Sequence, residues 1–378
     1  DLEQVLPIAK SLYDKGFEIH GIFSSKLSYG YGSRYIKRKY IHQNAVEIED
    51  YYLFIKSVLQ KERYVSIIPM RDSAAEVMCK YRDDLLQYTA YVMPDADGFE
   101  RGFDKQRLME VCKMHGYPHP ETYIVRNGSL CGLDIEEIRY PVLIKPNHTF
   151  GARGMTLCRN KDELEKKYPI IFNQFGECHL QTYIPEGGHQ VEVQIYINEK
   201  QELVQSSVIK KFRWYPNKGG SSCCNISCKN EKIVDICYKV LKSIGWVGFA
   251  DFDTIEDPRT GELLIMEINP RVPACVKSAF ASGIDWADVI VGEYLKKSHK
   301  VYQMNREVYL RFLGVEVLWF LKSENKWHTK PNWFNFFGKD IFYQDMSDWT
   351  DPMPFIRGTI GNIKKQLSPE FRKSKAGV

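Results

Sequence analysis

A predicted hairpin in the second half of the chain restricts the fold more than any other feature of the sequence. Residues 247–255 and 262–268 each alternate apolar with polar side chains, and the six residues between them include Asp, Pro and Gly. Because residues two apart on a strand face the same side, Glu267 and Asn269 present two oxygen ligands together. Asp253 lies on the partner strand, so we expect the hairpin to bring all three side chains to one face.

These three side chains are the kind of ligand set that a nucleotide-bound Mg²⁺ uses. Magnesium takes few carboxylates from a protein and completes its shell with water and substrate phosphates. Arg271, which follows Asn269 after one proline, would stabilise negative charge on a phosphoryl group during its transfer. The alternative is that the three polar side chains lie on an exposed sheet face and bind nothing. The three residues alone do not decide between a metal site and an exposed polar face.

The first hundred residues alternate between helical and strand-like patterns, which is typical of a parallel sheet with crossover helices. Helical spacing at 6–12 is followed by an alternating run at 17–23, then by a second helix at 51–60 and a short apolar run at 64–69. A doubly wound domain normally begins on a strand that leads through a glycine turn into its first helix. We therefore expect the first strand and its turn to be missing from this chain.

Two further segments predict contacts with a nucleotide. Lys145 ends an apolar strand and precedes a loop with Gly151 and Gly154, whose backbone N–H groups can approach phosphate oxygens. This loop is not a Walker loop, because its lysine precedes the glycines. Residues 181–192 follow with a strand, a glycine turn and two acids, which suit an adenine edge and ribose hydroxyls. Each segment alone is also compatible with an ordinary strand-end loop or hairpin.

The order of these features resembles the ATP-grasp superfamily, and within it the carboxylate–amine ligases related to the large subunit of carbamoyl-phosphate synthetase and to D-aspartate ligase. The resemblance covers about residues 1–295, and the segment Glu267–Arg271 is its most specific part. It implies an α/β fold, α+β in the ATP-grasp part. The implied parts are a Rossmann-like pre-ATP-grasp domain at 1–103, an ATP-grasp domain at 104–297 with a mobile lid at about 118–184, and a C-terminal aromatic-rich extension at 298–378.

The resemblance also implies roles for individual residues. Asp253, Glu267 and Asn269 would hold Mg²⁺, with Mn²⁺ as the alternative metal, and Arg271 and Lys145 would be catalytic. Residues 148–155 would form a mobile loop over the phosphates of ATP. The residues implied to contact ATP are Lys105, Lys145, Gly151, Arg153, Gly154, Met155, Gln181, Tyr183, Ile184, Glu186 and Glu192.

Two segments are expected to contact the substrates. Relatives among the amino-acid ligases carry a basic strand and a Pro/Gly loop by the active site, which implies that Lys210 and a catalytic Arg213 bind a carboxylate or the γ-phosphate. A solvated basic edge strand is the alternative. Arg71, Asp72 and Ser73 follow a buried run in the first domain, where loops of parallel sheets bind ligands, so we expect them near the acceptor substrate.

The sequence departs from the family pattern at three places. Gln181 stands where the hinge usually begins with an acid, Ala152 and Arg153 stand where a serine is common, and Ala274 stands near the position of a second arginine. The 378 residues contain neither a glutaminase domain nor a second synthetase half. We therefore do not expect synthesis of carbamoyl phosphate itself.

These features predict a ligase that activates a small-molecule carboxylate as an acylphosphate and joins it to an amine, with release of ADP and phosphate. A bicarbonate-activating ATP-grasp carboxylase is one alternative. A nucleotide-binding regulatory protein without turnover is another, and the presence of the expected metal ligands and phosphate lysines favours an enzyme over it.

Composition limits the partners and the location. A net charge of +4 is too small to predict a nucleic-acid partner, and no apolar run approaches the roughly 20 residues of a membrane span. Ten scattered cysteines without a Cys-x-x-Cys pair predict reduced thiols in a cytoplasmic protein. A homodimer is compatible with the sequence. We interpret the basic end of the chain as a solvated tail: Lys364, Lys365, Arg372, Lys373 and Lys375.

Overall fold

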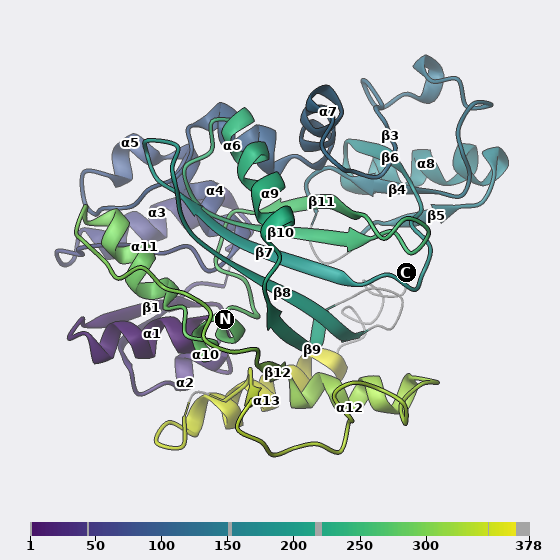
Figure 1. The fold of residues 1–378 in the computed structure, drawn as a ribbon. Coiled ribbons are helices and arrows are strands. Elements are labelled where there is room, and N and C mark those ends of the chain that lie inside the picture. The colour runs from purple at the N-terminus through teal and green to yellow at the C-terminus, as the bar shows by residue number, and fades with distance from the viewer. Residues whose placement is uncertain (1, 44, 150–152, 216–220, 347, 368–378) are drawn as a thin grey trace.

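The structure is a computed structural model, and it describes residues 2–43, 45–149, 153–215, 221–346 and 348–367 (Figure 1). Within these residues the chain forms three sheets, of two, four and seven strands, with helices packed around them. Among the described helices, none combines the length and apolar character that crossing a bilayer needs.

The N-terminal region is helical with one small parallel sheet, in which β1 pairs with β2. The helix–strand alternation predicted from the sequence is present at its start, with α1 followed by β1. The apolar run predicted as a strand at 64–69 forms only a parallel bridge between Ser66 and Ala90. The elements are α1 (Val5–Asp14), β1 (Ile19–Phe23), α2 (Tyr29–Gly32), β2 (Ile36–Ile41), α3 (Ile48–Leu59), α4 (Asp72–Lys80), α5 (Arg82–Leu85) and α6 (Ala96–Phe103).

The four-stranded sheet forms a separate layer with its own core, beside α8 (Figure 1). It follows α7, whose N-cap Asp104 accepts a hydrogen bond from the Arg107 N–H. Its strand order is β3-β6-β4-β5, and apolar side chains such as Ile144, Leu164 and Leu180 fill the space under α8. The elements are α7 (Lys105–His115), β3 (Thr122–Tyr123), η1 (Leu130–Gly132), β4 (Val142–Pro146), β5 (Thr156–Cys158), α8 (Lys161–Phe175) and β6 (Cys178–Thr182).

The seven-stranded sheet is the centre of the molecule, with strand order β11-β10-β7-β8-β9-β12-β13. The predicted hairpin is confirmed, because β10 and β11 pair antiparallel. Among the described strands of this sheet, only β12 and β13 pair in parallel. The elements are β7 (Gln190–Ile197), β8 (Leu203–Tyr215), β9 (Ser221–Cys228), α9 (Glu231–Ser243), β10 (Gly248–Glu256), β11 (Leu263–Asn269), α10 (Lys277–Ala281), α11 (Trp286–Tyr294), β12 (Tyr309–Arg311), α12 (Leu313–Lys322), β13 (Ile341–Tyr343) and α13 (Met353–Leu367).

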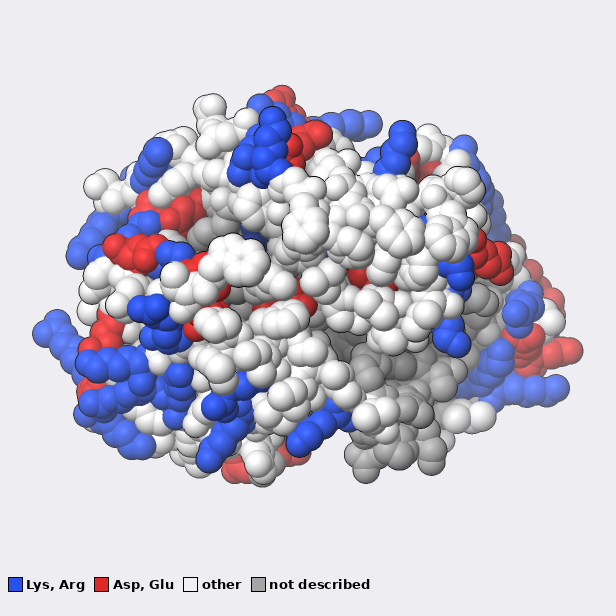
Figure 2. Space-filling view, turned by 90° about the horizontal axis from the view of Figure 1, so that it is seen from below, with Lys and Arg blue, Asp and Glu red and all other residues white. Residues whose placement is uncertain are grey.

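The aromatic-rich C-terminal segment is built into the body of the protein. Its strands β12 and β13 continue the large sheet beyond β9, while α12 packs on β8 and α13 packs on α2. Figure 2 views the molecule from the side on which α12 and α13 lie. The segment therefore ties the sheet to the N-terminal region.

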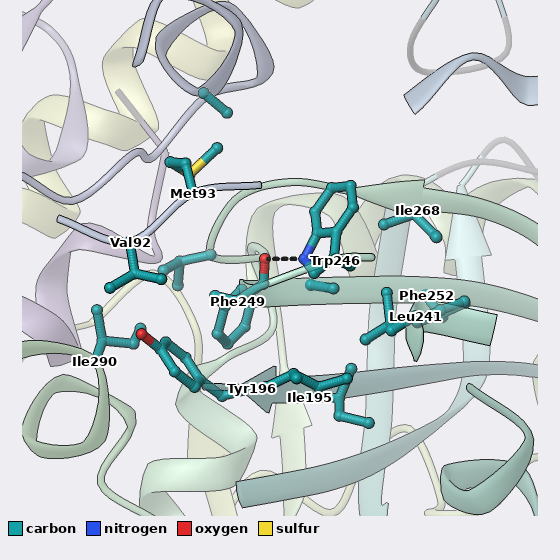
Figure 3. Packing of buried hydrophobic residues seen from close by; sticks show 14 of the residues in the cluster. Val92, Met93, Ile195, Tyr196, Leu241, Trp246, Phe249, Phe252, Ile268 and Ile290 are labelled. Atoms are coloured by element: carbon teal, nitrogen blue, oxygen red, sulfur yellow. Dashed lines mark hydrogen bonds between the residues drawn. The ribbon is translucent and has the colours of Figure 1, made fainter. Parts of the chain in front are cut away.

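One hydrophobic core joins the large sheet to the N-terminal region (Figure 3). Phe249 and Phe252 of β10 pack with Trp246, whose indole N–H donates to the Phe249 carbonyl at 3.4 Å. Val92 and Met93 enter the same core from the segment before α6. Burial of each such side chain contributes roughly 1.5–3 kcal/mol, so this core fixes the N-terminal loops against the sheet.

A buried charge triad holds α12 against the sheet. Glu316 of α12 forms ion pairs with Arg213 of β8 and Arg311 of β12, and none of the three side chains is exposed. Burial raises the pKa of Glu316, and the two guanidinium groups oppose that rise. Arg213 Nη1 also donates to the Pro331 carbonyl at 2.7 Å, and Arg311 Nη2 donates to the Trp333 carbonyl at 2.8 Å.

This placement corrects the prediction that Arg213 is catalytic. The Arg213 guanidinium is fully buried against Glu316 and lies near the Trp319 ring, at 5.3 Å from its centroid. A buried arginine that is already paired with a carboxylate cannot turn toward a substrate without leaving that carboxylate unpaired. Arg213 therefore has a structural role.

We predict that Glu316→Gln lowers the free energy of unfolding by about 3 kcal/mol or more, because it leaves two buried guanidinium groups without a counter-charge. Urea denaturation followed by circular dichroism measures this loss. The control Glu324→Gln lies in the same segment but is exposed, and it should change stability by less than about 0.5 kcal/mol. A loss below about 1 kcal/mol for Glu316→Gln would contradict the structural role of the triad.

Candidate active site

The acidic residues of the hairpin meet on one face of the sheet. Asp253 of β10 lies directly across from Glu267 of β11, and Asp251 lies across from Asn269. The Asn269 amide donates to Asp253 Oδ2 at 3.2 Å and to Asp251 Oδ2 at 3.3 Å. The structure thus brings together Asp253, Glu267 and Asn269, as the alternation of the two strands predicts.

A lysine that the sequence reasoning missed lies in the middle of this acidic cluster. Lys211 Nζ of β8 is 2.6 Å from Asp253 Oδ1 and 3.4 Å from Glu192 Oε2 of β7. Burial alone would lower the pKa of Lys211, but the two carboxylates raise it well above its ordinary value. Burial likewise favours the neutral form of Asp253, and the Lys211 charge nevertheless holds the pKa of that carboxyl below its usual range.

The neighbouring Lys210, which was expected to contact substrate, lies on the other side of β8. It is half-buried and pairs in register with Val191 and Ile226, and successive residues of a strand face opposite sides. The hairpin between β7 and β8 sets the register that places Lys211 opposite Gln190 and next to Glu192. Only a correct prediction of that register could have distinguished Lys211 from Lys210.

Asp251 has a pKa that is shifted in the opposite direction from that of Asp253. Its burial, together with the charges of Glu192 and Asp253, raises its pKa well above the ordinary value. Among the described residues its Oδ1 atom has no hydrogen-bond partner. The sheet face therefore holds an orphaned carboxyl oxygen beside the predicted metal ligands.

The two predicted phosphate lysines converge on the same place. Lys145 at the end of β4 donates to Gln181 Oε1 at 2.9 Å, and burial lowers its pKa to about 8. Lys105 Nζ is 3.3 Å from Glu267 Oε2 and donates to the Thr149 carbonyl at 2.5 Å. Lys105 thus connects the start of the predicted phosphate loop to a predicted metal ligand.

The loop that follows β4 is described only at its two ends. Gly151 lies outside the described residues, as do Phe150 and Ala152. At the near end, His148 Nε2 is 2.9 Å from Asp104 Oδ2, and the pairing with Asp104 raises the pKa of the imidazole. At the far end Arg153 is exposed and Met155 half-buried, while Gly154 has a φ of +75°, which favours glycine.

The predicted nucleotide hinge connects the two larger sheets. After β6 ends at Thr182, the Tyr183 N–H donates to the Pro141 carbonyl at 3.0 Å, Ile184 is buried and Glu186 is exposed. Glu192 lies farther on, within the acidic cluster, and its Oε1 atom accepts from the Cys275 thiol at 2.7 Å. No pattern around Cys275 indicated this contact.

The first residue of α4, in the N-terminal region, completes the site. Arg271 Nε donates to Asp72 Oδ1 at 3.1 Å, while Arg271 Nη2 donates to Asn269 Oδ1 at 3.3 Å. Arg71 and Ser73 flank Asp72 and are half-buried. The acidic face is therefore surrounded by the positive charges of Lys105, Lys145, Lys211 and Arg271, an arrangement that can bind a polyphosphate together with a divalent cation.

The chain has relatives by sequence. The model of the family described as "Carbamoyl-phosphate synthase L chain, ATP binding domain" matches residues 104–294. A D-aspartate ligase from Enterococcus faecium is 27% identical over 243 residues, which are 58% of this chain and 58% of that protein. The match therefore spans less than two thirds of that relative.

Solved structures agree on the fold. The biotin carboxylase domain of the Hydrogenobacter thermophilus 2-oxoglutarate carboxylase, solved as a dimer with MgADP, ADP and bicarbonate, has a TM-score of 0.63 at 21% identity, over 82% of this chain and 72% of that one. An L-amino acid ligase from Bacillus licheniformis has a TM-score of 0.62 at 13% identity, over 82% and 77%. At these identities the likeness concerns the fold, which is that of the ATP-grasp proteins.

The family match covers more than half of the chain, from the N-cap of α7 to the end of α11. It includes Lys105 and Lys145, the two lysines predicted to contact phosphates, as well as the acidic hairpin and Arg271. The chain belongs to the family of the carbamoyl-phosphate synthase L chain ATP-binding domain, and it has the ATP-grasp fold.

Proposed function

We propose that the protein is an ADP-forming ligase that joins a small-molecule carboxylate to an amine. The observation that carries this proposal is the sheet face on which Asp253, Glu267 and Asn269 lie beside Lys105 and Lys145. Similarity to a D-aspartate ligase supports an amino acid among the substrates. A homodimer and a cytoplasmic location stay predictions.

The metal proposed for this face is Mg²⁺. Asp253, Glu267 and Asn269 offer hard oxygen atoms, and the orphaned Asp251 Oδ1 beside them is a buried acceptor that a cation or its water shell would satisfy. Mn²⁺ would accept the same oxygen donors. Bound at these residues, the metal would neutralise phosphate charge on ATP.

We assign the nucleotide to the space between the two larger sheets. Lys105 and Lys145 would contact its phosphates under the loop 148–155, and the hinge at Tyr183–Glu186 would face its adenosine. Gln181 holds Lys145 through a neutral amide, where the family usually has an acid. Because an amide does not cancel the ammonium charge, that charge stays available for a phosphate.

The proposed reaction has two steps. A carboxylate oxygen bonds to the γ-phosphorus of ATP while the bond from that phosphorus to ADP breaks, which gives an acylphosphate. The amine nitrogen then bonds to the acyl carbon, the C–O bond breaks, inorganic phosphate leaves with that electron pair, and water takes one proton from the nitrogen. Lys145 and Arg271 would stabilise the transferred phosphoryl group, and Asp72 would orient Arg271.

A bicarbonate-activating carboxylase is the second candidate. It is favoured by the structural neighbour that was solved with bicarbonate and MgADP. Phosphate release from MgATP, measured across carboxylates crossed with amines, separates the two candidates. Release that requires both a carboxylate and an amine supports the ligase, whereas release with bicarbonate alone supports the carboxylase. ATP binding without any release would support a regulatory protein instead.

We predict that Glu267→Gln lowers kcat on the order of 100-fold, because it removes one metal-binding charge and the partner of Lys105. The measurement is ADP formation at saturating MgATP and substrates. Glu262→Gln, an exposed change on the same hairpin, is the matched control and should keep full activity. Full activity in Glu267→Gln, with an unchanged melting temperature, would remove Glu267 from the metal site.

We also predict that affinity for ATP falls as the pH rises through about 8, because the buried Lys145 then loses its proton. Phosphates favour the charged ammonium, so the Kd for ATP should rise steadily above this pH. Lys145→Arg stays protonated over the whole range and should flatten the profile. Isothermal titration calorimetry between pH 7 and 10 tests this, since a profile identical in wild type and Lys145→Arg would exclude Lys145 as the titrating group.

A further inference from the structure

The two faces of α13 have opposite environments. One face packs closely on α2 and on the loop before α2. A Cβ atom at Gly358 would lie 2.2 Å from the Tyr29 ring, and one at Gly361 would lie 2.7 Å from the Leu27 carbonyl oxygen. The Asn362 amide also donates to Tyr29 Oη at 2.9 Å. This face fixes how the helix is rotated about its own axis.

The opposite face of α13 carries a stripe of apolar side chains that the described residues leave exposed. These side chains are between 40% and 62% exposed, and their spacing of three and four residues keeps them on one narrow line along the helix. Trp349, just before the helix, is 96% exposed. An exposed apolar stripe of this kind marks an interaction surface. Its members are Met353, Ile356, Ile360, Ile363 and Leu367.

Positive charge accompanies the stripe. The helix contains no Asp or Glu, and Arg357 and Lys364, seven residues apart, lie at one border of the stripe. Residues 353–378 contain six Lys and Arg and one Glu, so they hold a net charge of +5, while all preceding residues together hold −1. Figure 2 shows the face seen from below, on which Lys and Arg lie mostly toward the borders, with Asp and Glu among them and mainly other residues between.

We propose that α13 docks the protein on an anionic lipid surface, with the apolar stripe in the headgroup region and Arg357 and Lys364 at the lipid phosphates. Amphipathic helices with apolar side chains on one face and Lys or Arg at its border bind such surfaces while lying parallel to them.

Other occupants fit the stripe less well. A stable dimer buries about 800 Å² on each partner, which is much for one stripe on a helix about 22 Å long. In a dimer, the positively charged ends of the two copies would also repel each other. A nucleic acid would meet the Lys and Arg side chains but has no use for five aliphatic side chains.

Sedimentation of the full chain with vesicles tests the proposal. The vesicles are phosphatidylcholine alone and phosphatidylcholine with phosphatidylglycerol. We expect binding only to the vesicles with phosphatidylglycerol, and weaker binding at higher salt. Ile363→Asp should lower the partition coefficient on the order of tenfold or more, and Lys364→Glu should lower it as well. Ile170→Asp changes an equally exposed isoleucine on α8 and should bind like wild type.

Three results would overturn the proposal. The first is wild-type protein that stays in solution with phosphatidylglycerol vesicles. The second is equal binding by Ile363→Asp and wild type, with melting temperatures that verify folding of both. The third, from light scattering without lipid, is a wild-type dimer that Ile363→Asp converts to a monomer, because a second copy of the chain would then cover the stripe.

Discussion

The ion pair between Lys211 and Asp253 is the interaction on which the site depends. Glu192 and Asp251 are buried on adjacent strands and Asp253 beside them is half-buried, and in such surroundings unpaired carboxylates are costly and repel one another. Lys211 supplies a fixed cation from β8, next to both Glu192 and Asp253. The acidic face can therefore form as the chain folds, because its charge is already partly neutralised within the sheet.

Alternation along the strands made the hairpin predictable, together with the face shared by Asp253, Glu267 and Asn269. β10 and β11 lie within one residue of their predicted bounds, because each carries a period of two and is bounded by turn residues. Lys211 was missed for a physical reason. The choice between Lys210 and Lys211 depends on the register of β8 against β7, and a shift of one residue exchanges the two faces.

Short and distant elements could not be read from the sequence. β12 and β13 are three residues long, so neither shows a period. Arg213 sits beside a basic run that suits an anion, yet its counter-charge Glu316 comes from a helix far along the chain. Local pattern records the charge of a side chain but not the partner that tertiary structure provides, and a buried arginine therefore has the same local signature as a catalytic one.

The pairing of β12 with β9 has a consequence for dissecting this protein. The family match ends at residue 294, before β12 begins. A polypeptide cut there would leave the long strand β9 with unpaired N–H and C=O groups, which invite intermolecular β-pairing. In the intact chain, the sheet instead ends in the three-residue β13, too short to serve as a template. The family boundary is thus a boundary of sequence similarity and not of an independent folding unit. The aromatic segment beyond it covers the edge of β9, which would otherwise be open to pairing between molecules.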